Sequence, residues 1–268
     1  MRLFSTLIIA PVLILVPTVA RAASLPDTGQ TLCDNGSSVM TACSDANAGD
    51  AATQPRQDGR FGRDAQATAG TPGQIKLGAG AVGFDYTKVA NNGTDVGAGT
   101  ALGTAPTAWA CTRDNITGLT WEVKTATPTD LRYSGHTYTW YSTNGATNSG
   151  NAGSNTVTNT CGTPATVASC NTQAFVAAVN AAPGLCGFTD WRLPSRRELK
   201  TIVHIGGASP AIDTTYFPNT PAAVFWSSSP YAVSGPANAW VVYFGDGHNL
   251  VYLKTIPTNA RLVRGAQF

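Results

Sequence analysis

Charged residues are scarce in this chain of 268 residues. Asp, Glu, Lys and Arg together make up 12% of it, about half of the share that is usual in soluble proteins. A coiled coil needs far more charge, and a collagen needs glycine at every third position, whereas this chain has 28 glycines. Aromatic residues reach 9% and include six tryptophans, which excludes disorder of the whole chain. This composition is typical of secreted proteins rich in β-structure.

Motifs of the common enzyme and metal-binding classes are also absent. The sequence has no G-x-S-x-G motif, no phosphate loop, no dinucleotide-binding motif and no C-x-x-C pair. Its three histidines, His136, His204 and His248, have no partner that the sequence assigns. The Glu-Pro-Asn, Gln-Pro-Asp and Trp-Asn-Asp tripeptides of calcium-dependent lectins do not occur. We therefore expect no metal ion, no cofactor and no catalytic residue.

The one long apolar stretch lies at the start of the sequence. Arg2 precedes it, it covers residues 3–16, and the following Ala20-Arg21-Ala22 fits the small-x-small cleavage rule, so we expect a signal peptide over residues 1–22. A membrane anchor is the alternative, but the stretch is too short for a span of about 20 residues. Export to the periplasm, the cell surface or the medium is the expected localisation, with no membrane span in the mature chain.

Removal of the signal peptide changes the charge balance. The loss of Arg2 and Arg21 takes the basic residues from 17 to 15, equal to the 15 acidic ones. A net charge of zero does not favour binding to nucleic acid, so we expect no nucleic-acid partner.

All six cysteines follow the expected cleavage site. Export and an even number of cysteines predict disulfide bonds, for which six cysteines allow 15 connectivities. Spacing favours Cys33–Cys43 and Cys161–Cys170 as short loops, which leaves Cys111–Cys186 as a long-range link.

The mature chain divides into two parts. Residues 23–108 have little patterning and read as a loop-rich N-terminal extension, with short strand-like pieces at residues 75–77 and 84–89. Residues 109–268 hold the recognisable pattern and are expected to form the folded domain.

Two helices are expected in this domain. In residues 172–182 the apolar residues recur at helical spacing, and Pro183-Gly184 ends the helix. Residues 195–205 begin with a capping box in which Ser195 and Glu198 bond to each other's backbone amide. The apolar residues of the two stripes are Phe175, Val176 and Val179 in the first helix, and Leu199, Ile202 and Val203 in the second.

Strands are expected on both sides of the helices, at residues 119–123, 138–141, 224–228, 240–244, 250–254 and 261–264. In residues 240–244 the alternation places Trp240, Val242 and Phe244 on one face of the strand. Helices combined with a mainly antiparallel sheet define an α+β fold.

Six motifs carry a resemblance to a known family. They are the segments Asp114-Asn115-Ile116-Thr117-Gly118-Leu119-Thr120-Trp121, Asp190-Trp191-Arg192-Leu193-Pro194-Ser195 with Glu198-Leu199, Pro210-Ala211-Ile212-Asp213 with residues 216–220, and residues 225–229, 239–244 and 261–264. In this order, across roughly residues 111–265, they resemble the Lcl C-terminal-type domain, an exported bacterial domain of unknown function. The resemblance implies a C-type-lectin-like α+β fold. The family's namesake is the C-terminal domain of a bacterial collagen-like adhesin that binds sulfated polysaccharides.

The fold that the resemblance implies is shared with formylglycine-generating enzymes. Their central motif is similar to Arg192-Leu193-Pro194-Ser195 followed by Glu198, but those enzymes need reactive thiols late in the domain. This chain has no cysteine after Cys186. An enzyme of unknown reaction is therefore the least favoured of three functional hypotheses.

Candidate ligand-binding residues fall into two groups. Arg192, Arg196, Arg197 and Lys200 form the only dense basic cluster, and guanidinium groups bind sulfate or carboxylate with paired hydrogen bonds. A solvated helix face, with Arg192 paired to a carboxylate, is the alternative. The aromatic candidates for stacking on sugar rings are Trp226, Tyr231 and Trp240, for which the alternative is a place in the core.

We therefore expect an exported, non-catalytic binding protein that recognises an acidic or sulfated polysaccharide. The second hypothesis is a structural component of a surface or appendage that binds protein partners.

Overall fold

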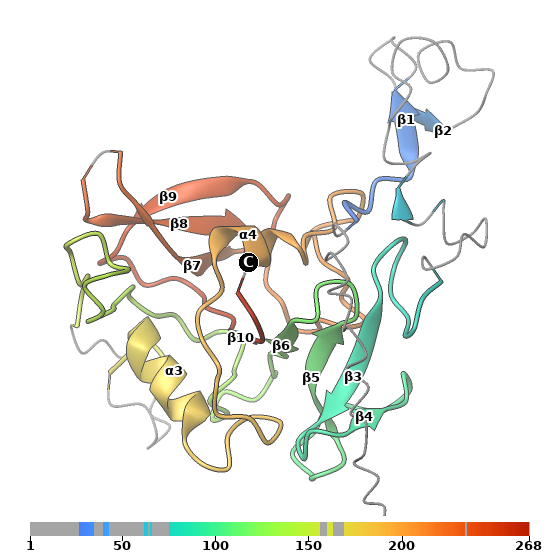
Figure 1. Cartoon of the computed structure of the whole chain (residues 1–268), viewed down its shortest axis with the longest axis horizontal. Helices are drawn as coiled ribbons and strands as arrows, with labels where there is room; N and C mark the ends of the chain where they lie inside the picture. Colours follow the sequence, from blue (N-terminus) through green and yellow to red (C-terminus); the bar gives the residue numbers. More distant parts are fainter. Residues whose placement is uncertain are drawn as a thin grey trace, which may run out of the picture.

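The computed structural model of the chain describes residues 27–34, 40–42, 62–63, 65, 75–155, 160–162, 169–233 and 235–267. These residues form two helices and three antiparallel sheets, which confirms the α+β class (Figure 1). The elements are β1 (Leu32–Asp34), β2 (Met40–Ala42), β3 (Tyr86–Ala90), β4 (Asp95–Val96), β5 (Trp109–Asp114), β6 (Thr120–Glu122), α3 (Thr172–Asn180), α4 (Arg196–Lys200), β7 (Val224–Tyr231), β8 (Asn238–Tyr243), β9 (Asn249–Leu253) and β10 (Val263–Arg264).

The largest sheet has five strands in the order β10-β6-β5-β3-β4. It joins segments far apart in the sequence, because β10 pairs with β6 while β3 pairs with β5. The strand expected within residues 84–89 is thus confirmed as β3, and it lies in the same sheet as β5 and β6. By contrast, no strand forms at residues 75–77, where Ile75 and Leu77 are exposed and have no core to pack against.

The other two sheets are smaller. β1 and β2 form a two-stranded sheet, and β7, β8 and β9 form a three-stranded one with β8 in the centre. β7 is longer than predicted and continues through a bulge to Tyr231. A strand at residues 138–141 was expected but is not present, because Tyr138 and Thr139 bridge to different partners, Thr258 and Asn171, and no continuous ladder results.

Helix α3 begins where an asparagine caps it. The side chain of Asn171 accepts a hydrogen bond from the amide of Ala174, which satisfies an amide that has no partner within the helix. Phe175 and Val179 are buried, as the apolar stripe predicts, and Val176 is partly buried.

Helix α4 has the predicted capping box but is shorter than predicted. Ser195 accepts from the Glu198 amide and the Glu198 carboxylate accepts from the Ser195 amide. After Lys200 the chain tightens, because the Val203 amide bonds three residues back to Lys200. The amides of His204 and Ile205 then bond to distant carbonyls, at residues 211 and 28, and the helix does not continue. The stripe residues Leu199, Ile202 and Val203 are nevertheless all buried.

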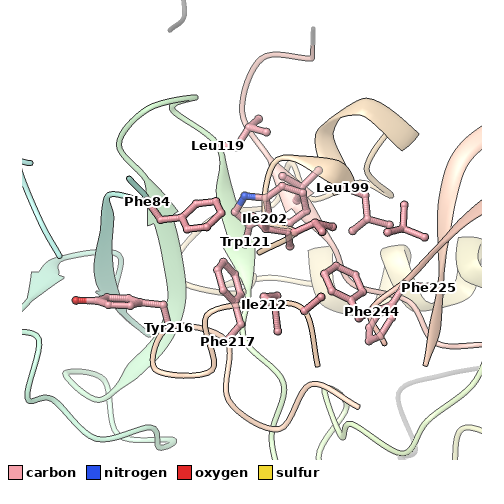
Figure 2. Close-up of a cluster of buried hydrophobic side chains, with 14 of the residues drawn as sticks. Phe84, Leu119, Trp121, Leu199, Ile202, Ile212, Tyr216, Phe217, Phe225 and Phe244 are labelled. Atoms are coloured by element: carbon pink, nitrogen blue, oxygen red, sulfur yellow. The ribbon is translucent and has the colours of Figure 1, made fainter. Parts of the chain in front are cut away.

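The main core lies between the five-stranded sheet, α4 and the three-stranded sheet (Figure 2). Trp121 of β6 faces the apolar side of α4 there, and the rings of Phe225 and Phe244 meet edge to face with centroids 5.1 Å apart. A second cluster packs α3 against β5 and the disulfides, and a third surrounds Trp226.

Two predicted disulfides are confirmed. Cys111 of β5 is bonded to Cys186, which follows α3, and Cys161 is bonded to Cys170. Cys33 is also disulfide-bonded, but Cys43 lies outside the described residues, so the Cys33–Cys43 pairing stays a prediction. Within the described ranges, no helix is long and apolar enough to cross a bilayer.

Candidate functional site

Three of the predicted ligand residues meet on one surface. The guanidinium carbon of Arg196 lies 4.3 Å from the centre of the Trp240 ring, and the Tyr231 ring meets Trp240 edge to face at 5.0 Å. A guanidinium over an indole face is held by the negative face of the ring. All three side chains are partly exposed. We call Arg196, Tyr231 and Trp240 the platform.

The platform follows from the alternation of β8. Trp240, Val242 and Phe244 lie on the face of the strand that α4 covers, and the last two are fully buried under the helix. Trp240 lies where α4 begins, so its ring meets Arg196, the first residue of the helix, rather than the apolar stripe.

A serine on β7 fixes the start of α4 in place. The backbone amide of Arg196 donates a hydrogen bond of 3.0 Å to the hydroxyl of Ser229. This contact ties one of the unpaired amides of the helix start to the strand beneath it. Sequence reasoning missed Ser229, although the residue lies within one of the family motifs.

The other cations of the basic cluster on α4 differ in whether they already have a partner within the protein. Arg197 is exposed next to the platform, and neither Arg196 nor Arg197 forms an ion pair within the described parts of the chain. Lys200 donates to the carbonyl of Gly247 at 2.5 Å, and burial lowers the pKa of its ammonium group, a shift that Asp246 opposes. The guanidinium groups of Arg196 in the platform and of Arg197 beside it therefore have no carboxylate partner among the described residues.

Arg192 has a structural role instead. Its guanidinium donates two hydrogen bonds, of 2.8 and 2.6 Å, to the carboxylate of Glu198, which is fully buried. A third bond of 3.2 Å reaches the carbonyl of Gly265. The guanidinium is thus occupied, in line with the alternative that pairs Arg192 with a carboxylate.

Trp226 is not part of the site either. It is fully buried, and its indole N–H donates to the carbonyl of Tyr138 at 2.7 Å. No ring face is left for a ligand, which corresponds to the alternative of a tryptophan in the core.

Two cavities lie away from the platform. One of about 280 Å³ is lined by Tyr86, Lys88 and Tyr216 among others, and one of about 210 Å³ lies between Arg132 and the end of α3. None of the predicted ligand residues lines either cavity. The described residues contain no group of three or more His, Cys, Asp or Glu that could hold a metal ion.

Fold and surface together define a disulfide-bonded α+β protein whose candidate site is an open aromatic and basic surface. More particularly, residues 110–264 match the family model of the Lcl C-terminal domain, which covers more than half of the chain. The chain therefore belongs to the Lcl C-terminal domain family. A search of curated proteins found no match to it.

Proposed function

We propose that the protein is an exported, non-catalytic binding protein that recognises an anionic polysaccharide through the platform and Arg197. The observation that carries the proposal is the Arg196 guanidinium, which is stacked on Trp240 and has no carboxylate partner among the described residues. We also propose that the fold is C-type-lectin-like, as the resemblance implies.

The chemistry of the platform suits such a ligand. Paired N–H donors of a guanidinium match the oxygens of a sulfate or carboxylate. The Arg196 side chain is already held by Trp240, and its backbone amide is held by Ser229, so part of the freedom that binding removes is lost beforehand. The partly exposed edge of the Tyr231–Trp240 pair offers an apolar surface on which a sugar ring can lie.

Export is supported by two observations. The sequence begins with the pattern of a signal peptide, and two disulfides lie in the folded part of the chain. Disulfides persist in oxidising compartments, so we place the protein in the periplasm, at the cell surface or outside the cell.

A glycan array tests the proposal. The purified chain of residues 23–268 is screened at two salt concentrations, and we expect binding to sulfated or uronic-acid glycans that weakens as salt rises. Trp240→Ala and Arg197→Glu should each reduce that binding by tenfold or more. Arg113→Ala is the control, because this exposed arginine is paired with Asp95, away from the platform.

A blank array from a folded, disulfide-bonded sample would contradict the proposal. So would equal binding by the Arg197→Glu variant and the unmodified chain.

The second candidate function is binding of a protein partner as a structural component. Tyr, Trp and Arg are the residue types that dominate the energy of protein interfaces, and all three meet at the platform. The exposed side chain of Leu253 lies at the end of β9, and that of Val233 lies just beyond the end of β7. Recovery of a defined protein complex together with a blank glycan array would favour this function.

A further inference from the structure

β9 is the outermost strand of the three-stranded sheet (Figure 1). The bonds from the Tyr243 amide to His248 and from the Lys254 amide to Ala237 fix the phase of the β8–β9 ladder. In an antiparallel pair, hydrogen-bonded and non-hydrogen-bonded positions alternate. The residues whose amide and carbonyl groups therefore point away from β8 are Asn249, Val251 and Leu253.

These outward groups form the free edge of the sheet. Among the described residues, the only backbone bond to them is the one that the Ile256 amide donates to the Leu253 carbonyl at the end of the strand. A row of free amides and carbonyls on an extended strand is a template for another strand.

In the two larger sheets, every edge strand except β9 is very short, or is bulged and partly covered. β7, the opposite edge strand, has a bulge and contains Pro230, and part of it is covered because the Ser228 amide bonds to Pro194. β4 and β10 are only two residues long. β9 has five residues with the sequence Asn-Leu-Val-Tyr-Leu, which contains no charge and no proline. Charged residues and prolines are what usually prevents an edge strand from pairing with another chain.

We propose that β9 pairs with β9 of a second copy of this chain in antiparallel orientation, about a two-fold axis at Val251. This register joins Val251 to Val251 of the partner and places Asn249 opposite Leu253 at both ends. Every outward amide and carbonyl then faces an outward group of the other copy.

The strand's own charge pattern favours a second copy as the occupant. No like charges face each other across the two-fold axis, because β9 has none. Two cations of α4 lie on this face: Lys200 donates to the Gly247 carbonyl, two residues before β9, and Arg196 lies above Trp240 of β8. Trp240 of one copy is three strand spacings from Trp240 of the other, about 14 Å, which exceeds the Debye length of about 8 Å at physiological salt.

Such a dimer has a six-stranded sheet with both platforms on the same face. This consequence rests on the proposed function: one long polysaccharide would contact both platforms, and its affinity would rise through effective concentration. The dimer itself does not depend on it.

Charge placement at the two outer positions tests the dimer. We would measure the mass of the chain of residues 23–268 by sedimentation over a range of concentrations, with no glycan present. The unmodified chain should be a reversible dimer. The double variant Asn249→Lys with Leu253→Lys places two pairs of like charges opposite each other and should weaken dimerisation by about tenfold or more.

The matched variant keeps one lysine and reverses the other charge. Asn249→Lys with Leu253→Glu places each lysine opposite a glutamate and should dimerise at least as tightly as the unmodified chain. Both variants change partly or fully exposed side chains at the ends of β9, and circular dichroism checks that they fold.

An unmodified chain that is monomeric at every concentration would overturn the proposal. Equal dimerisation of the two double variants would overturn it as well, because another surface would then form the dimer. Either result leaves the glycan proposal standing, since no glycan takes part in the measurement.

Discussion

At the scale of single residues, the buried cations show how this charge-poor chain uses the charges that it has. Lys254 is 1% exposed, and its ammonium group donates to the carbonyls of Asn148 and Asn151 at 3.0 and 2.7 Å. The group also lies 4.0 Å from the centre of the Trp140 ring. One cation thereby organises the Asn- and Gly-rich loop that follows Trp140.

Lys254 should give folding a recognisable pH dependence. Burial lowers its pKa from 10.5 to about 8, so the unfolded chain holds this proton more tightly than the folded chain does. The contribution of Lys254 to the free energy of unfolding should therefore rise with pH between about 8 and 10.5. Urea unfolding across this range, compared with Lys254→Met, checks the sign. Parallel pH profiles for the two proteins would show that the prediction is wrong.

Removal of the Arg192 side chain should lower the free energy of unfolding more than removal of most other side chains. Arg192→Ala leaves the fully buried Glu198 carboxylate without its guanidinium partner. Because Arg192 itself is 26% exposed, we expect a loss of about 2–4 kcal/mol, below the cost for a wholly buried pair. The exposed Arg113–Asp95 pair is the control, and Arg113→Ala should cost less than about 1 kcal/mol. Equal losses in urea unfolding would refute this assignment.

At the scale of elements, the start of α4 takes part in the capping box, in the ion pair with Arg192 and in the platform. The hydroxyl of Ser195 holds the helix start, and the carboxylate that completes the capping box also binds Arg192. The position of Arg196 over Trp240 therefore depends on how the helix begins.

Loss of the cap should cost a modest amount of stability. Ser195→Ala removes the acceptor for the Glu198 amide, and we expect a decrease of about 1 kcal/mol in the free energy of unfolding. Ser228→Ala is the matched control, because this hydroxyl makes no hydrogen bond within the described residues. Thermal unfolding of both variants measures the difference, and an unchanged Ser195→Ala protein would contradict it.

Local features were predictable from the sequence, whereas non-local backbone contacts were not; the one long-range link that was predicted is the Cys111–Cys186 disulfide. The Ser195–Glu198 box and the stripe of Leu199, Ile202 and Val203 depend on residues close in sequence, and both are confirmed. The end of α4 depends on carbonyls at residues 28 and 211, to which no spacing rule points. For the same reason, the bridges of residues 138–139 were mistaken for a strand.

The same limit applies to the candidate site. Basic and aromatic residues were identified by type alone, which does not distinguish Trp226 in the core from Trp240 on the surface. Both tryptophans lie on strands of one sheet, but the pairing of Trp226 with Val241 turns Trp226 away from the face of Trp240, which is the face that α4 covers.

At the scale of the whole molecule, the two confirmed disulfides constrain very different lengths of chain. Cys111–Cys186 spans 75 residues and joins β5 to the segment after α3, whereas Cys161–Cys170 spans nine. The longer loop loses more conformational freedom in the unfolded state when it is closed.

Removal of the two disulfides should therefore have unequal effects. Loop-closure entropy gives about 4.5 kcal/mol for the bond between Cys111 and Cys186 and about 2.6 kcal/mol for the one between Cys161 and Cys170. Paired cysteine-to-alanine variants compared by urea unfolding test this order. A larger loss from the Cys161 and Cys170 variant would contradict the entropic account.

The pairing of β10 with β6 has a consequence for how the chain is made. Val263 and Arg264 complete one edge of the largest sheet, and Val263 also bridges to Arg192. The two strands are far apart in the sequence, with both helices and the three-stranded sheet between them. This edge of the largest sheet therefore forms only after the helices and strands that lie between β6 and β10 in the sequence have been translated.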